Sequence, residues 1–565
     1  MSRAFRLPGP PGWILAPVII ALIVLSPVAA LVAIASAGSG DLWPQLLAYV
    51  LPQAAWNTAV LILGVGIVVS LIGVSTAWLV STARFPGRDV FDWALLLPLA
   101  IPTYIIAYAY LDILHPLGPI QSALRGLLGI TDPRTLHFPD IRSMWGVILL
   151  LGFVLYPYVY LAARATFLMQ TASALEVART LGAGRFEIFF RIALPLARPA
   201  IVVGVTLALL EALNDIGATE FLGVRTLTVS IYSTWLNRSS LAGAAQISLF
   251  MLAIVIGLFL LERWARRHQR FAGSAKRAHP LAPVELKGMS AFAACLVCAI
   301  PLLVGFVAPF LYLANQASQK IAAGGFSTML LTEVRHTLTF AGIATLATVF
   351  LGLIVAYALR IGRNKITPVA SRVASLGYAI PGTVLAVGLL FPLAAFDNAV
   401  DAAFRQWFDI STGLLISGSG AALVLAYTIR FLAISINGLE AGYAKIPQSI
   451  DHAARSLGET AMGTMRRVHL PMLRPALGAA AILVFVDCMK ELPATLMLRP
   501  FGVETLATHI YAEAVRGTYE DGSVAALLIV LAGLVPVILL ARVSRAIVSS
   551  SGSPAVQTLN AGMSR

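Results

Sequence analysis

The sequence predicts an all-α membrane protein with twelve transmembrane helices, arranged as two parallel six-helix repeats. Three observations predict this fold class. First, 59% of the 565 residues are hydrophobic and only 12% are charged, a composition that would leave a water-soluble protein with large exposed apolar patches. Second, many apolar runs reach the roughly 20 residues that a helix needs to cross a bilayer. Third, the second half of the chain repeats features of the first half in the same order.

Twelve apolar runs are long enough to be membrane spans. The first run is too long for a cleavable signal peptide and lacks the small-residue cleavage pattern, so we interpret it as a span. The tenth run departs most from the pattern, because it contains Arg430 and a Gly-Ser-Gly break at 418–420. In chain order the predicted spans are 13–36, 58–80, 90–113, 144–168, 199–218, 244–262, 291–315, 337–359, 369–396, 411–434, 476–496 and 523–541.

The formal net charge of +14 is better explained by membrane topology than by nucleic-acid binding. If the N-terminus lies in the cytosol and the spans alternate, most lysines and arginines fall in cytosolic segments, which is the positive-inside pattern. We therefore expect both termini in the cytosol and no nucleic-acid partner. Arg164, Arg430 and Lys490 are the basic residues in or at the edge of spans.

The internal repeat has a nearly constant spacing, with small differences in loop length. Asn57-Thr58 corresponds to His336-Thr337 at an offset of 279 residues, and other matches have an offset of 276 or 279. An even number of spans separates the copies, so the halves are parallel and related by an axis along the membrane normal, an arrangement that can form a translocation path between them. We expect a first half at 1–262, a basic cytosolic linker at 263–290, a second half at 291–545 and a disordered tail at 546–565.

Two polar segments of related sequence interrupt the apolar pattern on the predicted cytosolic side. The first repeated segment, Leu175–Pro199, reads LEVARTLGAGRFEIFFRIALPLARP, and the second, Asp451–Pro475, reads DHAARSLGETAMGTMRRVHLPMLRP. Each predicts a short helix, a glycine turn, a second short helix and a proline that ends it. The apolar residues of the second helix favour docking in a groove of another protein. An amphipathic helix lying on lipid headgroups is the alternative, but it does not explain two copies at matched positions.

These segments resemble the EAA motif of ATP-binding-cassette (ABC) importer permeases, in which E-A-A is followed by glycine and then by I-x-L-P. In the second segment His452 stands where the motif has glutamate, with Asp451 just before it, so we expect the two docking sites to differ chemically. The matching positions are Glu176-Val177-Ala178, Gly182 and Ile192-Ala193-Leu194-Pro195 in the first segment, and Ala453-Ala454, Gly458 and Val468-His469-Leu470-Pro471 in the second.

The resemblance implies a type I ABC importer permease of the bacterial inner membrane, whose repeated segments dock on two copies of a separate ATPase subunit. The chain has no G-x-x-x-x-G-K-[ST] motif, so we expect ATP and Mg²⁺ to be bound by that partner, and this chain to hold no cofactor and catalyse no reaction. Closure of the ATPase dimer would drive alternating access of the halves. The expected ATPase-coupling residues are Glu176, Ala178, Arg179, Gly182, Leu194, Pro195, His452, Ala454, Arg455, Gly458, Leu470 and Pro471.

The fused arrangement and the stretch AYAYLDILHPLGPIQSALR at 107–125 are similar to ferric-iron importer permeases, which work with a periplasmic iron-binding protein. The resemblance therefore implies ferric iron as the substrate and an iron-binding partner on the outer loops, roughly 114–143, 219–243 and 497–522. Fused thiamine importer permeases share much of this layout, so thiamine or another small organic solute is the alternative substrate.

Four acidic residues in predicted spans are candidates for the translocation pathway, because ionisable groups there are costly and carboxylates suit a highly charged cation. The residues of each pair are four apart and so are expected on one helix face. Structural pairing is the alternative, since Lys490 can neutralise a carboxylate whereas its counterpart Asn214 cannot. Glu220 is expected just beyond its span. The candidate pathway residues are Glu211, Asp215, Asp487 and Glu491.

Other side chains have a simpler interpretation. Cys295, Cys298 and Cys488 are expected to pack within spans rather than to bind metal. Two other function classes stay open: a secondary transporter that uses the acidic residues as a proton relay, and a membrane scaffold without transport. The tyrosines of spans three and four are expected to pack between helices or at the membrane interface rather than to ligate iron; they are Tyr104, Tyr108, Tyr110, Tyr156, Tyr158 and Tyr160.

Overall fold

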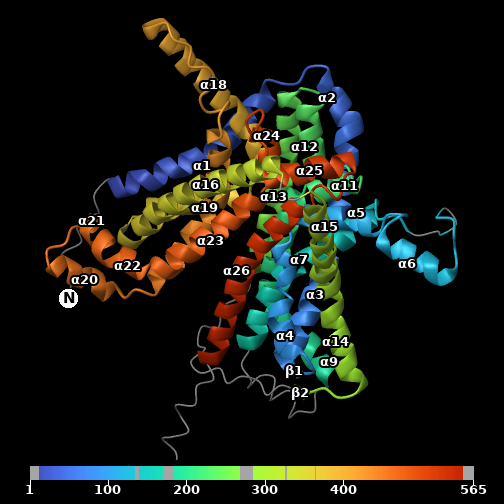
Figure 1. Cartoon of the computed structure of the whole chain (residues 1–565). Helices are drawn as coiled ribbons and strands as arrows, with labels where there is room; N and C mark the ends of the chain where they lie inside the picture. The colour runs from blue at the N-terminus through green and yellow to red at the C-terminus, as the bar shows by residue number, and fades with distance from the viewer. Residues whose placement is uncertain are drawn as a thin grey trace, which may run out of the picture.

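The chain is almost entirely helical in a computed structural model (Figure 1). The structure describes residues 12–133, 136, 139–169, 184–266, 284–324, 327–362 and 364–550. Within these ranges, the only strands are two short ones, β1 (Ala83–Arg84) and β2 (Val284–Glu285), which pair in parallel. This pairing joins the end of the second predicted span to the segment before the seventh.

The helices of the first half are α1 (Gly12–Ser36), α2 (Leu42–Gln45), η1 (Leu46–Val50), α3 (Leu51–Thr82), α4 (Arg88–Ala94), η2 (Leu97–Ala100), α5 (Thr103–Ile113), α6 (Pro119–Leu128), α7 (Met144–Met169), α9 (Arg185–Ile188), η3 (Phe189–Ala193), α10 (Leu194–Asn214), α11 (Gly217–Phe221), α12 (Leu227–Leu236) and α13 (Leu241–Arg266).

The helices of the second half are α14 (Met289–Leu302), η4 (Leu303–Val307), α15 (Ala308–Gly324), α16 (Thr328–Ile361), α17 (Ile366–Ala374), η5 (Ser375–Ala379), α18 (Gly382–Phe408), α19 (Ala421–Ala444), α20 (Gln448–Ser456), α21 (Ala461–Thr464), η6 (Met465–His469), α22 (Leu470–Met472), α23 (Arg474–Lys490), α24 (Pro493–Leu498), α25 (Leu506–Arg516) and α26 (Ser523–Ser550).

Membrane-spanning helices dominate the fold, as predicted. Ten helices in the described part of the chain are long and apolar enough to cross a membrane, and there are up to twelve if two sharply bent helix pairs each count as one span. The predicted fold class, an all-α multi-pass membrane protein, is therefore confirmed.

Two of the predicted spans are broken at a proline. In the run 90–113, the helices Arg88–Ala100 and Thr103–Ile113 meet at 91°, with Pro102 extended between them at ψ 144°. Pro381 has the same ψ of 144° immediately before α18, and so breaks the run 369–396. Proline lacks an N–H donor and disfavours helical geometry in the residue before it. Composition stays apolar across both breaks, so hydropathy did not reveal them.

Three predicted span boundaries were wrong. The run 411–434 begins too early, because α19 starts at Ala421, after the Gly-Ser-Gly break. The runs 199–218 and 476–496 extend too far, because α10 ends at Asn214 and α23 ends at Lys490. The short helices α11 and α24 follow as separate elements, and this change places acidic residues at helix junctions.

The internal repeat appears as matched backbone contacts. Thr58 Oγ1 accepts a hydrogen bond from the Leu227 N–H at 3.0 Å, and Thr337 Oγ1 accepts one from the Leu506 N–H at 2.9 Å. The π-helical turns η3 and η6 also occupy equivalent places, directly before α10 and α22. The two halves therefore share these elements in the same order, with matching hydrogen bonds between them.

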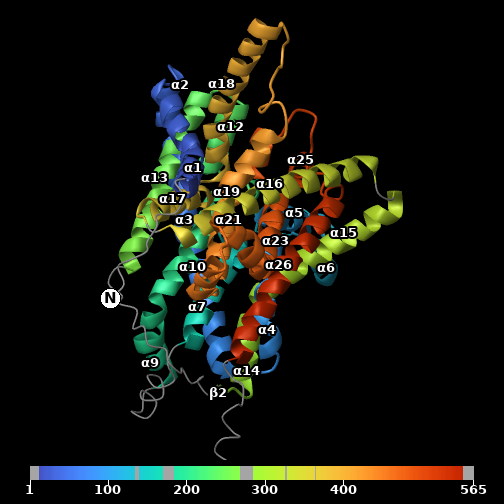
Figure 2. The ribbon, with the colours of Figure 1, turned by 90° about the vertical axis from the view of Figure 1, so that its left-hand side faces the viewer.

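Helices of each half pack against helices of the other half. Helix α1 packs on α16, α17 and α18 of the second half, and α14 and α15 pack along α3 and α5 of the first half (Figures 1 and 2). The halves approach closely at Gly388, where a Cβ atom would lie 2.5 Å from the Pro27 carbonyl oxygen. The boundaries expected at 262 and 291 remain a prediction, but the packing shows that the halves interlock.

Buried aromatic and sulfur-containing side chains fill the helix interfaces. Tyr108, Tyr156 and Tyr160 are fully buried in the largest core cluster, which agrees with the packing interpretation. All three cysteines are free, and Cys298 and Cys488 are buried.

Candidate functional site: an interhalf cavity and the repeated segments

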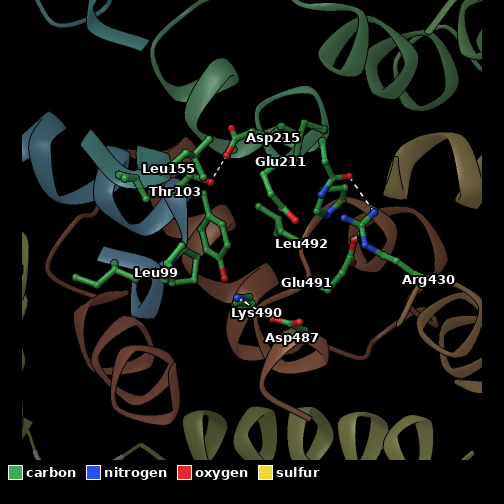
Figure 3. Close-up of a pocket in the computed structure, with 18 of the residues that line it drawn as sticks. Leu99, Thr103, Leu155, Glu211, Asp215, Arg430, Asp487, Lys490, Glu491 and Leu492 are labelled. Atoms are coloured by element: carbon green, nitrogen blue, oxygen red, sulfur yellow. Dashed lines mark hydrogen bonds and ion pairs between the residues drawn. The ribbon is translucent and has the colours of Figure 1, made fainter. Parts of the chain in front are cut away.

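A cavity lies between the two halves, and residues at equivalent positions of the repeat line it (Figure 3). All four candidate pathway acids are among its lining residues, so the structure brings them together. The equivalent lining pairs, each 276 residues apart, are Val154 and Arg430, Leu155 and Phe431, Glu211 and Asp487, Asn214 and Lys490, Asp215 and Glu491, Ile216 and Leu492, and Gly217 and Pro493.

Asp215 and Glu491 are used structurally. The Asp215 carboxylate accepts hydrogen bonds from the N–H groups of Ala218 at 2.8 Å and Thr219 at 3.2 Å, the first turn of α11. Glu491 accepts from Ala494 and Thr495, each at 3.1 Å, at the start of α24. Both acids thus satisfy N–H groups that a helix start leaves unpaired. They lie past the ends of α10 and α23, not on the helix face that their spacing predicted.

Glu211 and Asp487 remain on the helices and are only partly buried, so their carboxylates reach the cavity. Glu211 accepts a hydrogen bond from the Tyr378 hydroxyl of the other half at 2.8 Å. Asp487 forms an ion pair of 2.8 Å with Lys490, one turn away on α23. The predicted lysine pairing therefore exists, and it involves Asp487 rather than Glu491.

Arg430 joins the halves at the cavity wall. Its Nη1 donates to Asn214 Oδ1 at 3.0 Å and lies 4.0 Å from Glu491 Oε1. Asn214 Oδ1 also accepts from the Gly382 N–H at 2.7 Å. A Cβ atom at Gly382 would lie 2.5 Å from Glu491 Oε1, so a larger residue here would displace the Glu491 carboxylate. Sequence reasoning singled out Arg430 only as an anomaly; a charged residue inside an apolar run was the available signal.

The cavity as described contains no preformed metal site. Among the described residues, no group of three or more His, Cys, Asp or Glu side chains is placed to hold a metal ion. The bonds already made by the four carboxylates explain this: two bind backbone N–H groups, one binds Tyr378 and one binds Lys490.

The second repeated segment is described throughout, and its turn agrees with the prediction. Gly458 follows α20 with φ +84°, a left-handed conformation that glycine adopts without strain. His452 and Arg455 are exposed on α20, whereas Ala454 is buried. Apolar side chains that face solvent lie on both sides of the turn: Leu457, Met462, Leu470 and Met472. Such a surface is typical of a docking site.

The first repeated segment is described only from residue 184 onward, so the expected coupling residues Glu176, Ala178, Arg179 and Gly182 lie outside the described residues. Its remaining part also presents apolar side chains to solvent: Phe186 is 82% exposed and Phe190 is 59% exposed.

The predicted proline break is absent from the first segment. Leu194 and Pro195 begin α10, and the helix runs without a break from Phe186 to Asn214. The π-helical turn η3, which lies directly before this proline, changes the local hydrogen-bond pattern and lets the chain continue as a helix. In the second segment, by contrast, the chain bends by 75° at Leu473, just after Pro471.

Comparison with known proteins agrees with this architecture. The family "Binding-protein-dependent transport system inner membrane component" matches residues 69–271. The chain is 25% identical to the Fe(3+)-transport system permease protein FbpB 2 of Haemophilus influenzae, over 86% of this chain and 89% of that protein.

Two relatives match over a shorter part. The molybdenum transport system permease protein ModB of Escherichia coli is 30% identical, over 39% of this chain and 97% of its own length. A putative 2-aminoethylphosphonate transport system permease protein, PhnU of Salmonella paratyphi A, is 32% identical, over 32% of this chain and 63% of its own length.

Proposed function

The chain belongs to the family of inner-membrane components of binding-protein-dependent transport systems, and from this premise we propose that it is the fused permease subunit of an ATP-driven importer of ferric iron. Membership of the family means that the chain is a multi-pass inner-membrane permease of an ABC importer, which works with an ATPase and a periplasmic binding protein. The substrate, the number of ATPase copies and the roles of individual residues are our proposal.

Ferric iron is favoured by one observation: a relative that matches both halves, over 86% of this chain, is named an Fe(3+)-transport system permease protein. The relatives named for molybdenum and aminoethylphosphonate match at most 39% of the chain. The binding-protein partner would accordingly be an iron-binding protein, docked on the outer loops.

Transport would proceed through the interhalf cavity. Glu211 and Asp487 offer one carboxylate from each half, and oxygen ligands of this kind suit a hard cation. The bonds that cross between the halves, Tyr378 to Glu211 and Gly382 to Asn214, must exchange for new partners when the halves separate. We infer that these bonds close the cavity in the conformation described.

The driving motion would enter at the repeated segments. Their solvent-exposed apolar side chains, such as Phe186 and Leu457, support docking on two ATPase subunits, which would bind ATP and Mg²⁺ and hydrolyse the ATP. With these segments in the cytosol, both termini would be cytosolic as well. Closure of the ATPase dimer would then move each half as a body and open the cavity to one side at a time.

An oxyanion is the second candidate substrate, because the cavity also contains cations. Arg430 and Lys490 line it, and Arg430 Nε has no hydrogen-bond partner among the described residues. An oxyanion such as molybdate accepts hydrogen bonds from guanidinium groups.

Reconstitution tests the proposal. The permease is purified with its ATPase, placed in proteoliposomes with the iron-loaded binding protein, and uptake of radioactive iron is measured with and without ATP. We expect uptake only with ATP and the ATPase. Uptake by the permease alone under an ion gradient would instead identify a secondary transporter, and uptake of molybdate or thiamine but not iron would overturn the substrate.

A further inference from the structure

Asp451, in the first turn of α20, connects two basic side chains beneath the second half. Its Oδ2 lies 2.8 Å from Arg360 Nε at the end of α16, and its Oδ1 lies 2.6 Å from His469 Nε2 in η6. The side chain of Asp451 is 15% exposed and that of His469 is 1% exposed. A carboxylate at this position therefore holds three elements together from inside the fold.

The same network extends to the end of α19 and to α21. Arg360 donates from Nη2 to the Ile446 carbonyl at 2.8 Å and from Nη1 to the Tyr443 carbonyl at 3.2 Å. The Tyr357 hydroxyl donates to the Ala461 carbonyl at 2.5 Å. The rings of Tyr357 and Tyr443 stand edge-on to the His469 ring, at 5.6 and 5.3 Å. The helices α20 and α21 and the turn η6 are thus each tied to α16 or α19.

The first half fills the equivalent place with apolar side chains. Trp78, the counterpart of Tyr357, packs against Phe167 at 5.3 Å and Phe189 at 5.1 Å. Ala193, the counterpart of His469, is fully buried. The counterparts of Arg360 and Asp451 are Ser81 and Leu175, of which Leu175 lies outside the described residues. In the described part of the first half, Ser81 and Ala193 thus stand at the places of the charged Arg360 and of His469.

Stability alone does not account for the network. Removing charges from water costs about as much as their attraction returns, and well-packed apolar groups often stabilise equally well. In the described part of the first half, Trp78, Phe167 and Phe189 pack together at the equivalent place. The charged network adds geometric specificity, because charge-assisted hydrogen bonds fix the relative orientation of the helices that they join.

We propose that Asp451 is a positioning residue that fixes the second repeated segment to α16 and α19, so that ATPase movement is transmitted to the second half. The exposed side chains of α20, among them His452 and Arg455, are left for the ATPase itself. This inference rests on the proposed function. It predicts that loss of the Asp451 charge uncouples ATP hydrolysis from transport without detaching the ATPase.

The test uses the full transporter in proteoliposomes and measures substrate imported per ATP hydrolysed. Asp451→Asn is expected to lower this ratio about fivefold or more, within the range of measured coupling energies, while the ATPase still co-purifies. Asp451→Glu is expected to restore part of the ratio. Adding Arg360→Gln to Asp451→Asn is expected to lower it no further, because both changes break one network.

A control variant lies on the same segment. Glu459→Gln breaks the ion pair with Arg467 (2.7 Å), whose side chain is 78% exposed. An exposed pair of this kind contributes little, so the ratio is expected to stay unchanged. If Asp451→Asn reduces folding, the triple variant Arg360→Ser, Asp451→Leu, His469→Ala, which carries the first half's residues, leaves no unpaired charge and is expected to assemble and still lose coupling.

Three outcomes would overturn the inference: an unchanged ratio in the assembled Asp451→Asn transporter, full coupling in the triple variant, or loss of ATPase binding in Asp451→Asn, which would make Asp451 a docking residue. Failure of the proposed function is distinguishable, because the wild-type transporter would then import no iron with ATP.

Discussion

At the first repeated segment, Trp78 packs against Phe167 and Phe189, and the chain continues as one helix to Asn214. At the second, Tyr357 and Tyr443 surround a charged network centred on Asp451, and the chain bends by 75° before α23. The two places are equivalent in the repeat, yet in the described residues the first shows aromatic packing around Trp78 and the second shows directional hydrogen bonds around Asp451. The two halves therefore share the order of their helices but differ in the side-chain interactions at this place.

The cavity shows the same contrast on a smaller scale. The capping acids Asp215 and Glu491 perform one task in both halves. Asn214 and Lys490, directly before them, do not: the first accepts hydrogen bonds across the halves, and the second pairs with Asp487. The acidic residues that line the cavity are alike in the two halves, whereas Asn214 and Lys490 differ, so the cavity is chemically asymmetric at this position.

The largest effect is expected where both halves contribute equally to the pathway. Glu211→Gln combined with Asp487→Asn is expected to lower iron uptake about 100-fold, because each neutral amide weakens cation binding by about tenfold or more. The unfolding temperature is expected to stay within a few degrees. Uptake assays in proteoliposomes check this, and uptake within twofold of wild type would remove these acids from the pathway.

The caps are expected to respond as a matched pair. Asp215→Ala and Glu491→Ala each leave helix N–H groups unpaired, which costs about 1–2 kcal/mol of unfolding free energy, and uptake is expected to fall about tenfold. Thermal unfolding of the purified variants gives the stability change. A large loss for one variant and none for its partner would show that the junctions are not equivalent.

Replacing Lys490 by its first-half counterpart, asparagine, is expected to have a smaller effect. The direction of this effect distinguishes a cation substrate from an oxyanion substrate. Lys490→Asn gives the second half the residue of the first and releases Asp487. We expect Tb³⁺ to bind the purified permease about three- to tenfold more tightly, measured by luminescence. If molybdate is the substrate, the same variant should instead weaken molybdate binding, and a lack of change in either ligand would contradict a role for Lys490.

The smallest effect concerns pH at the opposite end of the second half. Burial lowers the pKa of His509, but the hydrogen bond from its ring to Glu333 (3.1 Å) and the charges of Glu333 and Glu513 outweigh it, so the pKa lies above its ordinary value. The resulting stability is fully present below the unfolded pKa of about 6.5 and is lost as pH rises through the raised folded pKa.

The first half has Ser230 and Ala54 at the places of His509 and Glu333, so it provides the control. His509→Ser is expected to remove a pH-dependent contribution of about 1 kcal/mol or less. Unfolding temperatures measured between pH 6 and 9 check this, and an identical pH slope in wild type and variant would refute it.

Sequence patterns determined the spans and the repeat well, because hydropathy and residue spacing report directly on burial and duplication. Hydropathy does not mark the breaks at Pro102 and Pro381, but the prolines themselves do, because proline cannot donate a backbone hydrogen bond and so favours a kink in a span. The end of α10 was also missed, although Asn214 and Asp215 are residue types that favour helix ends and turns over helix interiors. Without that boundary, the hydrogen bonds of Asp215 and Glu491 to the starts of α11 and α24 could not be foreseen, and their place in the pathway stays a prediction.

The role of Asp451 was hidden for a different reason. Comparison with the EAA motif directed attention to position 452, where histidine replaces glutamate. The partners of Asp451, Arg360 and His469, are 91 and 18 residues away, and only the folded chain brings them together. Arg430 was noticed as an intramembrane charge, but its partner Asn214, 216 residues away, had no sequence signal.

The most direct test measures the distance between the two repeated segments during the ATP cycle. Arg191 and Arg467 are equivalent in the repeat and each side chain is 78% exposed, so spin labels can be attached there after change to cysteine in a chain whose three native cysteines are replaced. In the assembled transporter, the distance between the labels is expected to shorten when ATP binds and to lengthen after hydrolysis. A distance that stays constant while iron is imported, or a permease to which no ATPase binds, would contradict coupling through these segments.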